Sequence, residues 1–253
     1  MNYFFGINNE IFKSRVEIPI FKNRSIPDKQ IKLYEIYIDE KKWKYTNIEK
    51  KNSESNFFII DEKNSSNDKI YFLSKDKSIN KFNNDQLENL NDFTDTVPAF
   101  RSNLKILIIN GGFSSYQSEY PFQMIKSKGS IVSSVASLTN SSADKNYLIF
   151  KNIFHFPINE KFNGFFVDIK NKKIMEKFEL ITNYTNQIEI NKKLLNENIF
   201  FVSQDYLGIP MYVSTKDNHI SFEHTHPLHE YILSKNRYEK VKQLKEQVNE
   251  IIN

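Results

Sequence analysis

The chain has no cysteine among its 253 residues, and it has little glycine, proline, arginine and tryptophan. Without cysteine it can form neither disulfides nor thiolate metal sites, so any metal must be held by histidine, carboxylate or carbonyl ligands. The sequence also lacks the phosphate-binding P-loop, the dinucleotide fingerprint, the Gly-X-Ser-X-Gly elbow and the His-Glu-X-X-His zinc helix. These absences argue against nucleotide hydrolysis by a P-loop, Rossmann redox chemistry and serine hydrolysis at a standard elbow.

Long hydrophobic runs are missing as well. No segment approaches the roughly 18 uninterrupted apolar residues of a membrane-spanning helix. The first ten residues have neither the basic region nor the apolar region of a signal peptide. We therefore expect a soluble, cytoplasmic protein with no membrane partner.

Charge gives little information about partners. The net charge is +4, and lysine accounts for 31 of the 35 basic residues. Lysine, asparagine, isoleucine and phenylalanine are abundant while alanine, glycine, arginine and proline are scarce, which is the pattern of A+T-rich coding. Lysine and glutamate are interspersed and form no basic block that could follow a phosphate backbone. We expect no nucleic-acid partner.

Segments typical of β-strands dominate the chain. They are rich in β-branched and aromatic residues and are separated by breaks that contain glycine, asparagine or proline. The clearest segments are 31–38, 56–60, 69–73, 104–109, 130–138, 147–150, 165–169, 174–181, 187–190, 199–203 and 211–213. Roughly a dozen strands at this spacing predict a mostly β fold, an antiparallel β-sandwich or barrel of the jelly-roll type.

Composition suggests a division of the chain. A polar segment from 75 to 96 separates a predicted N-terminal β lobe, residues 1–95, from a main antiparallel β domain, residues 96–232. The alternative is that the lobe and the main domain form a single continuous domain. Residues 233–253 form the remaining unit, which has the pattern of a helix.

An amphipathic α-helix is predicted in this C-terminal unit. Its apolar residues recur at intervals of three and four, with lysine and glutamate between them. Val241, Leu244, Val248 and Ile251 form only about two heptads of an apolar seam, and a coiled coil needs about three or four. Packing of the helix onto the β body is therefore favoured, and a homodimer through the helix is the alternative.

Ligand-capable side chains are concentrated in one place, the segment 223–230, which holds three of the five histidines. Residues 211–214 and 219–222 flank a turn-like tetrad and predict a hairpin. If the second strand continues, the period of two places His224 and His226 together on its apolar face. Neighbouring imidazoles on one face can bind one metal ion.

A third metal ligand is expected just after these two histidines. Pro227 ends the strand, so that His229 or Glu230 can return toward the metal. Nitrogen and oxygen ligands suit Zn, Fe, Mn or Ni. The alternative is that these imidazoles cap turns, stack on aromatic rings or bind carbonyl groups.

The spacing His224-X-His226-X-X-X-Glu230 resembles the first metal motif of the cupins, small β-barrels that bind a divalent metal inside the barrel. By this resemblance His224, His226 and Glu230 would be the ligands. The chain departs from the cupin pattern, since Asn218 stands where glycine is usual and no histidine follows His229. We do not assign the chain to that family.

A second candidate site is the segment 110–121. Its opening Asn110-Gly111-Gly112 predicts a tight turn, and the rest is polar and aromatic. Tyr116 is a candidate for binding a sugar or another polar ligand. Glu119 is a candidate for acid–base catalysis, and Arg101 is a candidate for binding an anionic group of the substrate. The alternative is an edge strand with Tyr116 and Tyr120 on its outer face.

Two functions from different classes follow from these features. The first is a metal-binding β enzyme that acts on a small polar substrate, such as a sugar derivative, through the His-X-His site. The second is a non-catalytic β-sandwich that binds a glycan or a partner protein through the segment 110–121.

Overall fold

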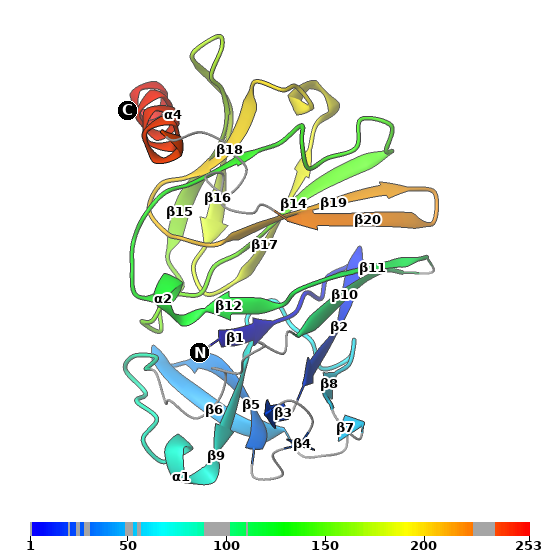
Figure 1. Ribbon diagram of the computed structural model, residues 1–253, viewed down its shortest axis with the longest axis vertical. Coiled ribbons are helices and arrows are strands. Elements are labelled where there is room, and N and C mark those ends of the chain that lie inside the picture. Colours follow the sequence, from blue (N-terminus) through cyan, green and yellow to red (C-terminus); the bar gives the residue numbers. More distant parts are fainter. Residues whose placement is uncertain are drawn as a thin grey trace.

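The computed structural model describes residues 2–19, 21–23, 26–27, 31–48, 53–54, 57–88, 102–109, 111–224 and 236–253. Strands make up 51% of the structure and helices 13%, which confirms the predicted mostly β class and the C-terminal helix. Four small sheets form the body, in an arrangement that resembles the blades of a propeller and is not clearly a sandwich or a jelly roll (Figure 1).

The first two sheets occupy the N-terminal half. Neighbouring strands in the first sheet are β12 (Glu119–Pro121), β1 (Asn2–Phe5), β9 (Ile70–Lys75), β5 (Ile31–Asp39) and β6 (Lys42–Ile48). In the second sheet they are β11 (Phe113–Tyr116), β10 (Asn103–Ile108), β2 (Phe12–Pro19), β8 (Phe57–Ile60) and β7 (Ser53–Glu54). Strands β3 (Phe21–Asn23) and β4 (Ile26–Pro27) form a separate two-stranded ribbon.

The other two sheets occupy the C-terminal half. The third sheet contains β13 (Ile131–Ser134), β18 (Ile199–Ser203), β15 (Lys161–Asp168) and β16 (Lys173–Ile181). The fourth sheet contains β17 (Thr185–Ile190), β14 (Lys145–Lys151), β19 (Ile209–Lys216) and β20 (His219–His224). The described helices are α1 (Asp76–Ile79), α2 (Phe122–Ile125), the 3-10 turn η2 (Lys192–Leu194) and α4 (Arg237–Ile252).

Strands from both sides of residue 96 share the first two sheets. Strand β10 pairs with β2, β11 pairs with β10, and β12 pairs with β1. These three strands, between residues 103 and 121, complete sheets whose other members lie before residue 76. These pairings do not test whether residues 1–95 fold by themselves. The boundary at residues 95 and 96 stays a prediction.

The two central strands of the fourth sheet, β14 and β19, are buried on both faces, and this separates the architecture from a two-layer sandwich. Strand β14 alternates in the usual way, so Tyr147 and Ile149 join a core with the first and second sheets. Leu148 and Phe150 point the other way and join a core with the third sheet. One sheet thus serves two hydrophobic cores.

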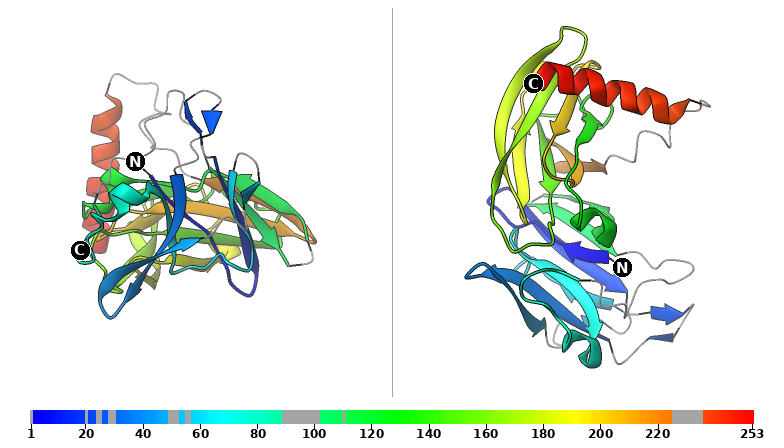
Figure 2. Two further views of the ribbon diagram at one scale, coloured as in Figure 1. Left: turned by 90° about the horizontal axis from the view of Figure 1, so that it is seen from below. Right: turned by 90° about the vertical axis from the view of Figure 1, so that its left-hand side faces the viewer.

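Helix α4 packs against the remaining face of the third sheet, as the sequence pattern favoured. Val248 is fully buried in a third apolar cluster with residues of β13, β15 and β18, and Leu244 and Ile251 pack beside it. The views agree that α4 lies at the end of the molecule far from β5 and β6 (Figure 2). Homodimerisation through the helix stays a prediction. None of the helices in the described part of the chain is long and apolar enough to cross a bilayer.

Candidate functional site

The hairpin that carries His224 forms as the sequence predicted. Strands β19 and β20 are joined by Asp217 and Asn218, with Lys216 opposite His219. Asp217 has φ of 50°, in the left-handed region that aspartate tolerates in tight turns. This short turn fixes the register and sets His224 opposite Met211.

The alternation along β20 is also as predicted. Phe222 is buried in the core shared with the first and second sheets, and Ile220 packs against the same core. His224 is half-buried on the same face, while Glu223 is exposed on the opposite face. The imidazole of His224 therefore points into the protein.

The rest of the predicted metal site lies outside the described residues, namely His226, His229 and Glu230. Among the described residues, no group of three or more histidine, aspartate or glutamate side chains is placed to hold a metal ion. A metal site that uses His224 stays a prediction.

Tyr116 and His224 meet where the second and fourth sheets come together. Their ring centroids are 3.6 Å apart at an interplanar angle of 77°. The ring of Tyr116 also meets the ring of Phe222 edge to face, at 5.9 Å. The hairpin ends are joined as well, because the backbone N–H of Gly112 donates to the carbonyl of Asn218 at 2.7 Å. The two predicted sites, about one hundred residues apart in sequence, are thus neighbours in space.

Glu119 is half-buried on β12. Its Oε1 accepts a hydrogen bond from the backbone N–H of Ser102 at 2.8 Å. The hydroxyl oxygens of Ser102 and Ser118 lie 2.7 Å apart, which ties the two segments together. The carboxylate is therefore held in a fixed position. Arg101, the predicted anion-binding residue, lies outside the described residues.

The expectation that Tyr120 lies on an outer face is wrong. Strand β11 is an edge strand of the second sheet and carries Tyr116, but the chain then moves to the first sheet, where β12 buries Tyr120 completely. The hydroxyl of Tyr120 donates to the carbonyl of Leu207 at 3.1 Å, and burial raises the pKa of this phenol. Tyr120 thus attaches β12 to the loop before β19.

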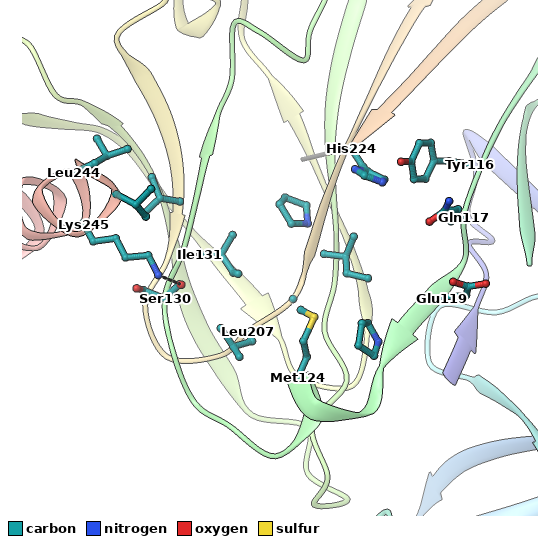
Figure 3. A pocket seen from close by; sticks show the side chains of 16 residues that line it. Tyr116, Gln117, Glu119, Met124, Ser130, Ile131, Leu207, His224, Leu244 and Lys245 are labelled. Atoms are coloured by element: carbon teal, nitrogen blue, oxygen red, sulfur yellow. Dashed lines mark hydrogen bonds between the residues drawn. The ribbon is translucent and has the colours of Figure 1, made fainter. Parts of the chain in front are cut away.

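Tyr116, Glu119 and His224 all line one cavity of about 490 Å³ (Figure 3). Most of the lining is apolar and comes from β12, α2, β13, the start of β19 and α4: Pro121, Met124, Ile131, Val132, Leu207, Ile209, Pro210, Val241 and Leu244. The polar side chains are those of Tyr116, Gln117, Glu119, Ser130, His224 and Lys245.

No protein-family model, no curated protein and no solved structure matches the chain. The function must therefore be inferred from the cavity.

Helix α4 forms one wall of the cavity, which the sequence did not indicate. Lys245 donates from Nζ to the carbonyl of Ser130 at 3.1 Å and so joins the helix to the segment before β13. Val241 and Leu244 contribute apolar surface to the wall. The sequence pattern predicts packing onto the β body, or dimerisation, for Val241 and Leu244 and no role in a cavity.

Gly208 lines the cavity just before β19 and allows this part of the chain to approach β14 closely. A Cβ atom at this position would lie 2.2 Å from Cζ of Phe150 and 2.7 Å from the carbonyl oxygen of Lys151. Only glycine fits there without displacement of the strand. The signal in the sequence was a single glycine in a chain that has only six.

Proposed function

We propose that this protein is a ligand-binding module whose cavity takes a small molecule with a mainly apolar body. The observation that carries this proposal is the cavity of about 490 Å³, with apolar walls and a few polar side chains. Small-molecule sites have this form, since apolar walls supply affinity and a few polar groups set orientation. The volume is within the usual range for drug-sized ligands, roughly 300–1,000 Å³.

The apolar walls change the ligand class expected from the sequence. A glycan would bring many hydroxyl groups against Met124, Ile131 and Leu207, where they would lose hydrogen bonds to water without replacement. A ligand with an apolar body has no such cost. We therefore favour an apolar-bodied molecule over a sugar derivative for this cavity.

The expected affinity is modest. Burying roughly 200 Å² of apolar ligand surface is favourable by about 5 kcal/mol. Taken alone, that free energy corresponds to a dissociation constant on the order of 0.2 mM, and the loss of translational and rotational freedom on association weakens the apolar contribution further. A fluorescence titration suits this range.

Binding of the neutral fluorophore N-phenylnaphthylamine tests the proposal. We expect saturable enhancement of its fluorescence by the wild-type protein. Ile131 lines the cavity, so Ile131→Trp should fill it and weaken binding about tenfold or more, equal to ~1.4 kcal/mol. Ile174, on β16 of the same sheet, is 39% exposed and lies outside the cavity lining. Ile174→Trp is the matched control and should leave binding unchanged.

Absence of saturable binding, or equal effects of the two tryptophan variants, would contradict the proposal. Thermal unfolding of both variants must show that each remains folded. A cavity-filling effect is then separated from a loss of structure.

A second candidate function is metal-dependent catalysis, and one observation favours it. Glu119, Tyr116 and His224, which were predicted for separate roles in an enzyme, line the same cavity. We propose metal analysis of untagged protein as the test. A stoichiometric transition metal that is lost in His224→Ala/His226→Ala would support catalysis, whereas metal-free wild-type protein would exclude the predicted site.

A further inference from the structure

Lys245 brings a positive charge to the wall of the cavity that α4 forms. The side chain is half-buried and lines the cavity beside Leu244 of the same helix. Its Nζ donates to the backbone carbonyl of Ser130 at 3.1 Å, which places the amine between the helix and the segment before β13 (Figure 3). The ammonium group is therefore held at the cavity wall in a defined position.

The contacts of Lys245 leave hydrogen-bond donors available. An ammonium group has three N–H donors, and the carbonyl of Ser130 is the one acceptor that the described residues provide for it. No carboxylate in the described ranges forms an ion pair with Lys245. On the same helix, Glu246 pairs instead with Lys242, at 3.7 Å. Two donors and the positive charge of Lys245 remain for a ligand.

Ser130 offers a further donor at the same place. It lines the cavity, and it is the residue whose carbonyl accepts from Lys245. A serine hydroxyl can donate to a carboxylate oxygen, and hydrogen bonds to ionised groups are shorter and stronger than neutral ones. Lys245 and Ser130 together can thus bind one carboxylate.

Apolar side chains lie on both sides of this polar pair. Ile131 follows Ser130 directly, at the start of β13, and lines the cavity. Leu207 packs onto the chain just before Ser130, since a Cβ atom at Gly129 would lie 2.9 Å from Leu207 Cδ2. Met124 extends the apolar lining. A ligand whose head group binds the amine therefore meets apolar surface directly beyond it.

Exclusion of water by the apolar body decides the charge of the head group. A ligand that fills the cavity removes water from Lys245, and this is unfavourable for a charged group unless the ligand brings acceptors or opposite charge. A neutral head group offsets only part of the cost, and a cationic one adds repulsion. One ammonium group matches a singly charged carboxylate better than a doubly charged phosphate.

We propose, on the basis of the ligand-binding function above, that the ligand is an amphiphilic carboxylate. Its carboxylate binds Lys245 and the hydroxyl group of Ser130, and its alkyl or aromatic body lies against Ile131 and Leu207.

Isothermal titration of the full-length protein near neutral pH with three probes of one chain length tests this inference. The probes are octanoate, n-octanol and n-octylamine, which differ only in the head group. We expect octanoate to bind about fivefold more tightly than octanol, the effect of one partly exposed ion pair. Octylamine should bind more weakly than octanoate.

Three lysine variants identify the residue responsible. Lys245→Met keeps an unbranched side chain but removes the charge, so the preference for octanoate over octanol should disappear while octanol still binds. Lys245→Arg keeps the charge and should keep the preference. Lys240 is exposed on α4 and lies outside the cavity lining. Lys240→Met removes the same charge from the same helix and should leave the preference unchanged.

The outcomes separate the inference from the function on which it rests. Equal binding of octanol and octanoate, or tightest binding of octylamine, would overturn the anionic head group and retain the binding function. A preference for octanoate that persists in Lys245→Met, or that is lost equally in Lys240→Met, would overturn the role of Lys245. If none of the three probes binds, both the inference and the binding function are contradicted.

Discussion

Lys151 is a fully buried amine on the last residue of β14. It follows Tyr147 and Ile149 in the alternation, so its side chain points toward the N-terminal half. Its Nζ donates to the carbonyl of Asn67 at 3.2 Å and lies 5.9 Å from the centroid of the Phe5 ring. Burial lowers the pKa of Lys151 to about 7, against a smaller opposing effect of Asp68.

This pKa shift predicts a particular pH dependence of stability. The folded pKa of about 7 lies below the ordinary lysine value of 10.5. Below pH 7 both states are protonated, so burial of the charge destabilises the fold in full. Between the two pKa values the unfolded chain binds more protons, so stability rises with pH and the penalty is lost near the higher value.

Lys151→Met removes the titrating group and serves as the reference. From urea unfolding between pH 7 and 10, we expect wild-type stability to rise relative to the variant by on the order of 1 kcal/mol per pH unit. The contributions of other titrating groups to stability are common to the wild type and the variant, so they cancel in the difference. A difference that stays constant over this range would show that the amine titrates near its ordinary pKa in the folded state.

At the scale of elements, α4 combines two roles that its sequence pattern did not distinguish. Val248 is fully buried against the third sheet, whereas Val241 lines the cavity. Docking through Val248 therefore positions the wall of the binding site. A substitution that weakens the packing of Val248 should lower the free energy of unfolding, although Val248 itself does not line the cavity.

Val248→Ala is expected to lower the free energy of unfolding by about 1–3 kcal/mol, because buried methyl groups are lost and a small void remains. The urea midpoint measures this loss. Gln247→Ala is the control, since Gln247 is exposed on the same helix. Equal effects at the two positions would mean that the helix does not dock through Val248.

The elements that the sequence predicted are those with local signals. The hairpin at Asp217 and Asn218 has a turn of defined chemistry, and β20 alternates over its whole length. Strand β2 was not recognised, because its inward position 14 is a serine. Ser14 is fully buried, and its hydroxyl accepts from the N–H of Ile7 at 2.8 Å. A satisfied polar group inside a core is indistinguishable, in sequence, from a break in the apolar pattern.

The candidate site was predictable residue by residue but not as a cavity. Tyr116, Glu119 and His224 were selected for their chemistry, and the structure places them together. The apolar walls come from segments far apart in sequence, such as Met124 and Leu244, and their proximity depends on the packing of sheets. No periodicity in one segment reports such proximity.

At the scale of the whole molecule, the N- and C-terminal halves are joined by polar as well as apolar contacts. The side-chain amide of Asn9 donates to Gln187 Oε1 at 2.7 Å. The indole N–H of Trp43 donates to the carbonyl of His155 at 2.7 Å. The fourth sheet adds an apolar face to the core of the first two sheets. The two halves therefore depend on each other.

This dependence predicts the behaviour of a fragment that ends at residue 95. Residues 1–95 lack β10, β11 and β12 and lack the cover of the fourth sheet. We expect the fragment to show no cooperative urea transition by circular dichroism, whereas the full chain should unfold in a single transition. A cooperative transition of the isolated fragment would instead support the domain boundary predicted at residues 95 and 96.

The burial of β14 on both faces has a consequence for exchange of its amide protons with solvent. The strand is hydrogen-bonded to β17 on one side and to β19 on the other, and it belongs to both large cores. No local fraying exposes such a strand, so its amides should exchange with deuterium only when the whole chain unfolds. Those of β6, at the edge of the first sheet, should exchange through small openings. The slowest amides of β14 would thus report the global free energy of unfolding from inside the native protein.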